Sequence, residues 1–428
     1  MITIPDWPKV ALWQGKREHN LNNMYKILDS LGNPEKKLPK TIHIAGTNGK
    51  GSSQAFLKSI FTAAGFKVHS YTSPHLVYFN ERINLSGDCI GDDHLNELLA
   101  RVKFSCEKLS IEPTFFEGTT AAALLAFSET LADILILETG IGGRVDPTNA
   151  IEEPIITLIT PISYDHMEFL GGTIESIAQE KAGIIKTGVP CIISAQDKKV
   201  YDILLAKCEE FGAPSFCYEY DYGINILANE FDYLSQKYHL RFPKPSLLGD
   251  HQILNAAGAI ATIMMVNDQF KITAEQITIG ITNTVWPGRI QKIDPATYSH
   301  LAAENIQIYL DGAHNNGGAE VLANWMMQYL SEPTYLVIGM TRGRDPVSFC
   351  NFFRSIIKEG RTVTVKSEAS AHSATYLAQE ASKTGVVFKE SDSLQAAIGE
   401  LAALSVNQPV NIVIAGSLFL VADFLKLL

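Results

Sequence analysis

The chain carries a glycine-rich turn with a lysine, Gly46-Thr-Asn-Gly-Lys-Gly-Ser52, directly after an apolar run over residues 40–45. A strand followed by such a turn and a helix places consecutive backbone N–H groups around phosphate oxygens. Lys50 would add a positive charge near the β- and γ-phosphates, and the glycines permit close backbone approach. Gly51 stands where Ser or Thr usually follows the lysine, and Ile44 where the first glycine of the general pattern is expected. The sequence predicts a nucleotide-phosphate site, and the alternative is a glycine-rich turn without a ligand.

Polar clusters follow two further apolar runs. Glu138 comes directly after the run over residues 134–137, and Asp165 and His166 follow the run over residues 155–160. Open parallel sheets bind ligands at the carboxyl ends of their strands, so these side chains can reach one ligand edge. A carboxylate in that place could hold Mg²⁺. A lone histidine is more often a structural residue, but two consecutive strands that end in polar clusters favour a site.

A second set of candidates lies towards the C-terminus. His251 and Asn255 are four residues apart and would share one face of a helix, although an ordinary capped helix start explains the same residues. Arg289 precedes a linker candidate, and a guanidinium suits a phosphate target across a domain boundary. Asp311 and His314 follow the next predicted strand, from which they can reach into the same cleft.

The pattern of apolar runs indicates the elements that position these residues. Runs covered on both faces by helices are typical of parallel α/β sheets. An aromatic, alternating stretch over residues 200–244 predicts a few antiparallel strands, and the Ala- and Ile-rich stretch 253–266 predicts a buried helix that returns to the first domain. The runs of the first domain are residues 40–45, 67–71, 134–137, 155–160 and 190–194, and those of the second are residues 306–310, 335–339, 362–365 and 411–415.

The predicted fold class is α/β. A chain of 428 residues exceeds the size at which one core stops growing, so two domains are expected. Residues 1–291 are predicted to form a P-loop mononucleotide-binding domain with a mostly parallel sheet and a small antiparallel sheet, in which the helix after the phosphate loop opens at Ser53. Residues 292–304, with a proline and no periodicity, form the linker candidate, and residues 305–428 a second, Rossmann-like α/β domain.

Composition excludes several classes of protein. The formal net charge of -11 argues against a broad nucleic-acid-binding surface. The cysteines are scattered without a C-x-x-C pair, which excludes the usual zinc and secreted disulfide frameworks. The N-terminal residues lack the apolar stretch of a secretory signal, and the longest apolar tracts are too short or too interrupted to span a bilayer. We expect a cytoplasmic monomer without nucleic-acid or membrane partners.

The loop G-T-N-G-K-G-S resembles that of the folylpolyglutamate synthase and dihydrofolate synthase family, relatives of the Mur ligases, in which G-K-T is more usual. The stretches that begin at Glu138, Leu248, Trp286, Leu310 and Ile338 also match, so the resemblance covers nearly the whole chain. It implies an ATP- and Mg²⁺-dependent enzyme, with two ions, that adds L-glutamate to 7,8-dihydropteroate, tetrahydrofolate or both. The acceptor carboxylate would be activated as an acyl phosphate, because oxide is a poor leaving group.

The resemblance also assigns roles to individual residues. Lys181 alone looks like the solvated end of an amphipathic helix, but the family implies carbamylation by CO₂ and a catalytic role beside Lys50 and His166. The implied metal ligands are Ser73, Glu138 and His166. The implied ATP contacts are Asn48, Gly49, Lys50, Gly51, Ser52, Asn255, Arg289, Asp311 and His314. The implied substrate contacts are Phe116, Glu117, Gly118, Thr119, Arg144 and Asp146.

The chain departs from the family pattern at two places. Asn22 and Asn23 replace the Glu and Arg of a pterin-binding segment, and Asn316 replaces the Pro of an H-N-P motif. Three other readings remain open. A Mur-type ligase would act on another carboxylate, but the chain lacks a separate UDP-binding domain ahead of its loop. A P-loop kinase or ATPase leaves Arg289, Asp311 and the second domain without a role. A non-enzymatic relative would be expected to have lost Lys50, Glu138 or His166, and all three are present.

Overall fold

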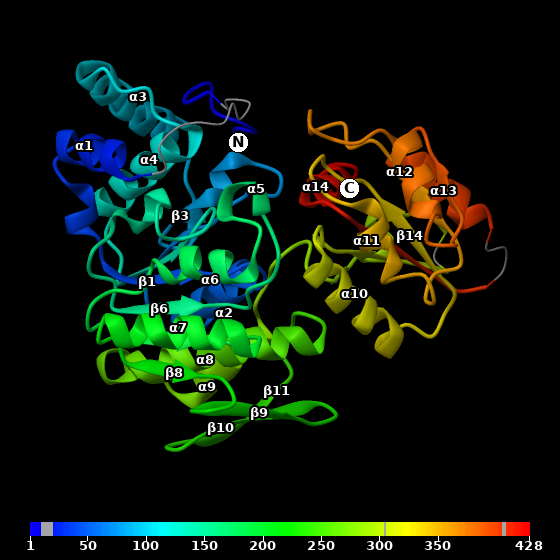
Figure 1. Cartoon of the computed structure of the whole chain (residues 1–428). Coiled ribbons are helices and arrows are strands. Elements are labelled where there is room, and N and C mark those ends of the chain that lie inside the picture. Colours follow the sequence, from blue (N-terminus) through cyan, green and yellow to red (C-terminus); the bar gives the residue numbers. More distant parts are fainter. Residues whose placement is uncertain (10–19, 304, 405–407) are drawn as a thin grey trace. The chain divides into compact units, whose positions relative to one another are not determined.

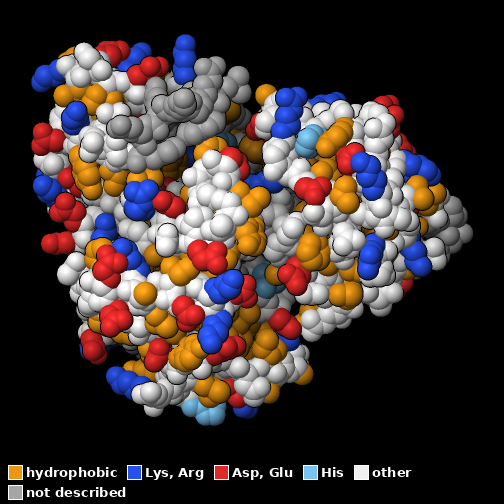
Figure 2. All heavy atoms as spheres, viewed as in Figure 1, with side chains coloured by type: hydrophobic (Ala, Val, Ile, Leu, Met, Phe, Trp, Pro, Cys, Tyr) orange, Lys and Arg blue, Asp and Glu red, His pale blue; other side chains and the backbone are white. Residues whose placement is uncertain are grey.

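The computed structural model describes residues 1–9, 20–303, 305–404 and 408–428, which form two compact units (Figure 1). The first unit comprises Met1–Ser246 and Gln252–Val285, and the second comprises Leu247–His251 and Trp286–Leu428. None of the described helices combines the length and the apolar character needed to cross a bilayer. On the face shown in Figure 2, acidic and basic side chains are interspersed among polar and apolar ones.

The first unit is built on an eight-stranded sheet of the described residues, in the order β4-β3-β2-β5-β1-β6-β7-β8. The strands from β2 to β8 in this order are parallel, and the edge strands β3 and β4 are antiparallel. The central strands are almost wholly buried, which explains why their sequences are mostly apolar. The bounds are β1 Lys40–Ala45, β2 Val68–Tyr71, β3 Ile83–Leu85, β4 Asp88–Cys89, β5 Ile134–Glu138, β6 Ile156–Ile159, β7 Cys191–Ile193 and β8 Ser215–Cys217.

Helices of the first unit pack on this sheet in separate core clusters. Helices α1, α3 and α4 share a core with Tyr71, Leu135 and Leu137, and helices α6 and α7 share another with Ile159 and Ile193. The bounds are α1 Asn22–Ser30, α2 Lys50–Ala63, α3 Asp92–Leu109, α4 Phe115–Glu129, α5 Met167–Leu170, α6 Ile174–Ala182, α7 Lys198–Glu210, α8 Asp250–Phe270 and α9 Ala274–Thr282, with the 3-10 helices η1 Pro34–Lys37, η2 Phe79–Arg82 and η3 Pro147–Ala150. The predicted strands of this part and the buried helix within α8 are confirmed.

The stretch over residues 200–244 is only partly the antiparallel sheet that its sequence predicts. Strands β9 Tyr222–Ile226, β10 Glu230–Ser235 and β11 His239–Pro243 do form an antiparallel sheet. The first third is instead helix α7 and the parallel edge strand β8, so the prediction is wrong there. Val200, Leu204 and Cys208 recur at helical spacing and are buried on one face, which decides for the helix.

The second unit has a six-stranded sheet of the described residues, in the order β12-β13-β17-β14-β15-β16. All neighbouring pairs are parallel except β12 with β13, as in an α/β layer arrangement. The strands are β12 Gln291–Lys292, β13 Ile306–Leu310, β14 Thr334–Ile338, β15 Gly360–Thr362, β16 Phe388–Glu390 and β17 Val410–Ala415; the helices are α10 Asn316–Tyr329, α11 Pro346–Asn351, α12 Ala374–Ser382, α13 Leu394–Ala403 and α14 Leu418–Leu425, with the 3-10 helix η4 Pro295–Thr297.

The linker candidate, residues 292–304, is packed against the second unit over its described part. Lys292 pairs with Tyr309 at the edge of the sheet. The Tyr298 side chain is fully buried, and its hydroxyl donates to the Ile306 carbonyl oxygen at 2.6 Å. The compact units therefore divide after Val285, earlier than the boundary placed at residue 291 from the sequence.

Candidate nucleotide and metal site

The glycine-rich loop connects β1 to α2 in the first unit. Helix α2 begins at Lys50, earlier than the predicted Ser53, and Gly49 precedes it with a φ of 84°. A Cβ on Gly49 would lie 2.4 Å from Asn255 Oδ1, and a Cβ on Gly46 would lie 1.9 Å from Thr160 Oγ1. Both glycines are therefore required by close neighbours as well as by their positive φ. The loop has the strand-turn-helix context that a phosphate site needs.

The loop is tied to the segment that follows β6. The backbone N–H groups of Thr47 and Asn48 donate to the Pro161 carbonyl oxygen at 3.0 and 3.1 Å. The Thr47 hydroxyl donates to the Ser163 carbonyl oxygen, and Asn48 Nδ2 to Ser163 Oγ, each at 3.1 Å. These bonds fix the loop against a neighbouring strand end and so hold its remaining N–H groups in a constant arrangement.

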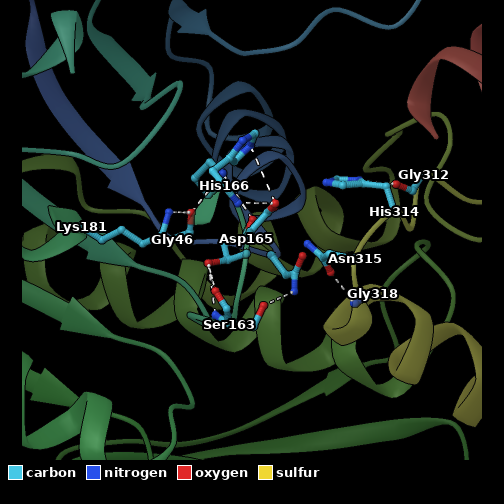
Figure 3. A network of polar contacts seen from close by, with 12 residues as sticks. Gly46, Ser163, Asp165, His166, Lys181, Gly312, His314, Asn315 and Gly318 are labelled. Atoms are coloured by element: carbon cyan, nitrogen blue, oxygen red, sulfur yellow. Dashed lines mark hydrogen bonds and ion pairs between the residues drawn. The ribbon is translucent and has the colours of Figure 1, made fainter. Parts of the chain in front are cut away.

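Two lysines converge on one backbone carbonyl of this loop. Lys50 Nζ donates to the Gly46 oxygen at 3.1 Å, and Lys181 Nζ donates to the same oxygen at 2.7 Å (Figure 3). Lys50 Nζ also lies 3.9 Å from Glu138 Oε1. The Gly46 carbonyl oxygen thus accepts hydrogen bonds from two lysine side chains, and the buried carboxylate of Glu138 lies near one of them.

Lys181 is buried, contrary to the solvated helix end that its local sequence suggests, with 4% of its surface exposed. Burial, together with the positive charge of Lys50, lowers the pKa of Lys181 to about 7. The negative charges of Asp165 and Asp146 oppose this shift. The amine and ammonium forms of Lys181 therefore both exist near neutral pH. Only the neutral amine is a nucleophile.

Ser73 comes after β2, and Glu138 is the last residue of the neighbouring strand β5. Tyr71 pairs with Leu137, so the ends of β2 and β5 are adjacent. The Thr72 hydroxyl donates to Glu138 Oε2 at 2.5 Å. The Ser73 hydroxyl is buried without a hydrogen-bond partner among the described residues. A hydroxyl and a carboxylate are ligands that hard divalent cations prefer, and the unpartnered Ser73 oxygen fits such a ligand.

His166 follows β6, on the other side of the phosphate loop from Glu138 in the strand order. Its φ of 49° is left-handed, its backbone N–H donates to Asp165 Oδ1 at 2.9 Å, and its Nε2 lies 3.9 Å from that oxygen (Figure 3). In the described part of the chain, no three His, Cys, Asp or Glu side chains gather as a metal cluster. The implied set is thus divided, with Ser73 and Glu138 on one side of the loop and His166 on the other.

The predicted substrate segment at the start of α4 makes mainly local contacts. Glu117 accepts the Thr114 backbone N–H at 2.7 Å as part of a helix cap, and the Thr119 hydroxyl donates to a backbone oxygen of the preceding turn at 2.8 Å. Pro8 packs on Gly118, and the Phe116 ring packs on Gly140. Of these side chains, the aromatic ring of Phe116 remains the best suited to a flat ligand.

Arg144 and Asp146 stabilise the segment after β5. Asp146 accepts the backbone N–H groups of Gly140 and Ile141 at 2.9 and 3.0 Å, together with that of Thr148 at 3.0 Å. Burial raises the pKa of Asp146, and these hydrogen bonds oppose the rise. Arg144 pairs with Glu180 at 2.7 Å. Both predicted substrate contacts therefore have structural partners.

The second unit has its own polar cluster. Asp311 is buried and accepts the Ile290 N–H at 2.8 Å and the Ala313 N–H at 2.7 Å. Ile290 has a φ of 46°, an unfavourable value for a β-branched residue, which these bonds help to hold. Arg289 lies across Gly312, where a Cβ would come within 2.3 Å of its Nη1. Burial raises the pKa of Asp311, and the Arg289 charge opposes this rise.

His314 and Asn315 follow this cluster at the start of α10. His314 Nδ1 lies 2.8 Å from the Gly312 carbonyl oxygen (Figure 3). The Asn315 side chain accepts the Gly318 N–H at 2.8 Å and caps the helix, so the helix start keeps its order although Asn316 replaces proline. His251 belongs to the second unit, and burial, together with the positive charge of Arg289, lowers its pKa to about 4. Asn255 belongs to the first unit and lies against the phosphate loop at Gly49.

Sequence reasoning did not single out Thr72 or Arg82. Thr72 precedes Ser73 and binds the Glu138 carboxylate. Arg82 ends η2, and its backbone oxygen accepts the Thr72 N–H at 3.0 Å. A hydroxyl beside Ser-Pro and an Arg beside Glu look like ordinary turn residues in a single sequence, so no local signal distinguished them.

Comparisons with known proteins show which sequences and structures the chain resembles. Residues 294–427 match the family model described as dihydrofolate synthetase, C-terminal domain, and residues 44–263 match the Mur ligase middle domain. The dihydrofolate synthase/folylpolyglutamate synthase of Bacillus subtilis is 37% identical over 330 residues, which are 74% of each chain. Escherichia coli FolC in complex with DHPP and ADP has a TM-score of 0.85 at 26% identity, over 97% of this chain and 94% of that one. A bifunctional folylpolyglutamate synthase/dihydrofolate synthase with Mn, AMPPNP and L-glutamate bound has a TM-score of 0.82 at 26% identity, over 96% and 95%.

Proposed function

Because the chain belongs to the dihydrofolate synthase/folylpolyglutamate synthase family, we propose that it joins L-glutamate to the carboxylate of 7,8-dihydropteroate, of tetrahydrofolate, or of both. It is an ATP-dependent ligase that forms carbon–nitrogen bonds. The observation that supports the phosphoryl-transfer step is the convergence of Lys50 and Lys181 on the Gly46 carbonyl oxygen, with Glu138 Oε1 3.9 Å from Lys50 Nζ, and the choice of acceptor is supported by the relatives.

A carboxylate must be activated before an amine can displace its oxygen. We infer in-line attack of the acceptor carboxylate on the γ-phosphate of ATP, followed by attack of the glutamate amine on the acyl phosphate and release of phosphate. Lys50, which lies against its own loop carbonyls, would turn to the phosphate oxygens. The N–H groups of Gly49 to Ser52 would surround the phosphates, while the Asn48 N–H stays bonded to the Pro161 carbonyl oxygen and Asn255 holds the loop at Gly49.

Two divalent cations, one held by Ser73 and Glu138 on one side of the loop and one held by His166 on the other, would offset the charge on the phosphate oxygens. The unpartnered Ser73 hydroxyl and the division of these residues by β1 support two cation positions. The relatives described with Mn and a nucleotide analogue support a divalent cation with ATP in this chain.

Lys181 is proposed to become a carbamate. Its neutral amine would attack CO₂ and lose a proton, so that an anion replaces the second cation beside Gly46. The lowered pKa of Lys181 supports this step because the nucleophilic amine is present at neutral pH. The anion would pair with Lys50 and support the cation site, which relieves the repulsion between the two ammonium groups.

The remaining assignments concern ATP and the acceptor. Arg289, Asp311 and His314 are proposed to contact ATP from the second unit, since Asp311 holds the backbone beside Arg289. Phe116 is proposed to stack on the flat part of the acceptor, whereas Glu117, Gly118, Thr119, Arg144 and Asp146 would shape its surroundings through the local contacts described above. Asn22 begins α1, so the changed pterin segment forms part of a regular helix.

The direct test measures ADP release with purified protein, ATP, Mg²⁺ and L-glutamate, comparing dihydropteroate with tetrahydrofolate. We expect release that requires both glutamate and at least one acceptor. The family model described as dihydrofolate synthetase supports the dihydropteroate arm. If neither acceptor supports glutamate-dependent turnover, the folate assignment is wrong, and turnover with another carboxylate would favour the Mur-type reading.

A further inference from the structure

Arg82 is a buried cation without an acidic partner among the described residues. It is 9% exposed and lies in the first unit. Its Nε donates to His75 Nδ1 at 2.9 Å, and its guanidinium carbon lies 5.2 Å from the centre of the Phe79 ring and 5.7 Å from that of Phe115. No described Asp or Glu forms an ion pair with it. The direct contacts of the guanidinium among the described residues are thus one imidazole and two aromatic rings, and Tyr71, Glu138 and Glu81 act on it electrostatically.

A buried cation in such surroundings is costly. Burial lowers the pKa of Arg82, which shows that the surroundings disfavour its charge. His75 accepts a hydrogen bond from only one of the N–H groups of the Arg82 guanidinium. The aromatic rings offset the cost of removing this positive charge from water only in part. The negative charge of Glu138 opposes the shift, but its carboxylate is already engaged by Thr72 and Lys50. An anion supplied from outside the chain would complete the arrangement.

The position of Arg82 indicates which kind of anion this is. Its backbone accepts the Thr72 N–H, and Thr72 binds Glu138, so Arg82 belongs to the strand ends that carry the candidate site. Phe115 adjoins Phe116, the aromatic residue proposed for the acceptor. A planar guanidinium matches a carboxylate with two parallel hydrogen bonds, and neighbouring rings suit an aromatic or apolar body attached to it.

We propose that Arg82 binds a substrate carboxylate in the ligase reaction. The inference rests on the proposed function. Two substrates offer this chemistry, the aryl carboxylate of the pteroyl acceptor and a carboxylate of L-glutamate. The rings around the guanidinium favour the aryl carboxylate. In either case Arg82 would orient the acid while Lys50 and the phosphate loop hold ATP.

Glu81 provides a matched control because it holds the same loop without belonging to the aromatic cluster. Its carboxylate accepts the backbone N–H groups of Leu76, Val77 and Tyr78 at 2.7, 2.9 and 2.7 Å. Glu81→Gln weakens these hydrogen bonds and removes one of the negative charges that act on Arg82, but it keeps the guanidinium itself. A purely structural effect of Arg82 on this loop would therefore be reproduced by Glu81→Gln.

The experiment compares wild type, Arg82→Gln, Arg82→Lys and Glu81→Gln. The KM values for acceptor, L-glutamate and ATP are measured, together with direct acceptor binding in the absence of ATP by calorimetry. For Arg82→Gln we expect the KM of one carboxylate substrate to rise about 10- to 100-fold, with the ATP KM changed by less than about twofold. Arg82→Lys should lie between, because it keeps the charge but loses the paired hydrogen bonds.

The outcomes separate the possible explanations. A selective rise for the acceptor, with weaker calorimetric binding, identifies the aryl carboxylate, and a selective rise for glutamate identifies the amino acid. Equal changes in all three KM values, no change, or the same pattern in Glu81→Gln would overturn the inference. Urea unfolding identifies a variant that fails to fold, and Arg82→Lys then carries the test. If wild type itself shows no glutamate- and pterin-dependent turnover, the proposed function fails instead.

Discussion

Replacing Gly49 by alanine should destabilise the phosphate loop by an amount that depends on Asn255. The φ of 84° costs alanine about 1–2 kcal/mol. The new Cβ would come within 2.4 Å of Asn255 Oδ1 and displace an amide whose Nδ2 donates to Gln252 at 3.1 Å, a loss of about 0.5–1.5 kcal/mol. Reduced freedom of the unfolded chain returns about 0.4–1 kcal/mol. The free energy of unfolding should fall by about 0.5–3 kcal/mol.

Urea unfolding of a double-mutant cycle tests this reasoning. In an Asn255→Ala background the contact is absent, so Gly49→Ala should cost about 0.5–1.5 kcal/mol less than in wild type. Gly65→Ala is the matched control, because Gly65 has a similar φ of 87° and no atom lies within 4 Å of the place that an added Cβ would take. An equal cost of Gly49→Ala in both backgrounds would refute the proposed contact.

Three further predictions concern charged groups. Lys50→Ala should lower kcat at least about 10³-fold, because the positive charge beside the transferred phosphate is lost; steady-state kinetics measure this, and urea unfolding identifies a variant that fails to fold. In CO₂-free buffer, Lys181→Met should be more stable than wild type by on the order of a few kcal/mol below pH 7. The difference should shrink as the pH rises towards 10.5. The reason is that the pKa of Lys181 is lowered to about 7 in the folded protein, so between pH 7 and 10.5 the unfolded chain binds one more proton than the folded chain and wild type gains stability as the pH rises. Unfolding curves at several pH values check this, and a difference that is independent of pH would contradict the buried amine. Asp311→Asn keeps one acceptor oxygen for the two N–H groups of Ile290 and Ala313, so it should cost about 1–3 kcal/mol in unfolding free energy and raise the ATP KM; an unchanged unfolding midpoint would contradict this role.

The strands and the phosphate loop could be predicted because their signals are local. The strand before Gly46 and the strand that ends at Glu138 are mostly apolar, and all of their residues except Lys40 are buried, as is typical of a parallel sheet covered on both faces. The start of helix α2 lies three residues before the predicted one, since a helix can begin inside a glycine-rich turn when a left-handed glycine precedes it. The helix Lys198–Glu210 escapes the prediction because its apolar spacing merges with the aromatic strands that follow.

The rest of the site depends on contacts between residues far apart in the chain. Lys181 looks solvated in its own helix, and only the approach of the Gly46 carbonyl explains its burial. Arg82 and Thr72 acquire their partners through the pairing of strand ends. The sequence also does not reveal that Glu117 and Asp146 have local partners. A carboxylate that binds backbone N–H groups and one that contacts a ligand look the same in a single sequence. A single sequence does not encode such partners in its spacing.

The most direct test of ligation through an acyl phosphate is an isotope transfer. The acceptor acid is labelled with oxygen-18 in its carboxylate, the reaction is run with ATP and L-glutamate, and the released phosphate is analysed by mass spectrometry. Attack of the carboxylate on the γ-phosphate predicts that one carboxylate oxygen appears in each phosphate released, in step with amide formation. Amide product accompanied by unlabelled phosphate would contradict the mechanism.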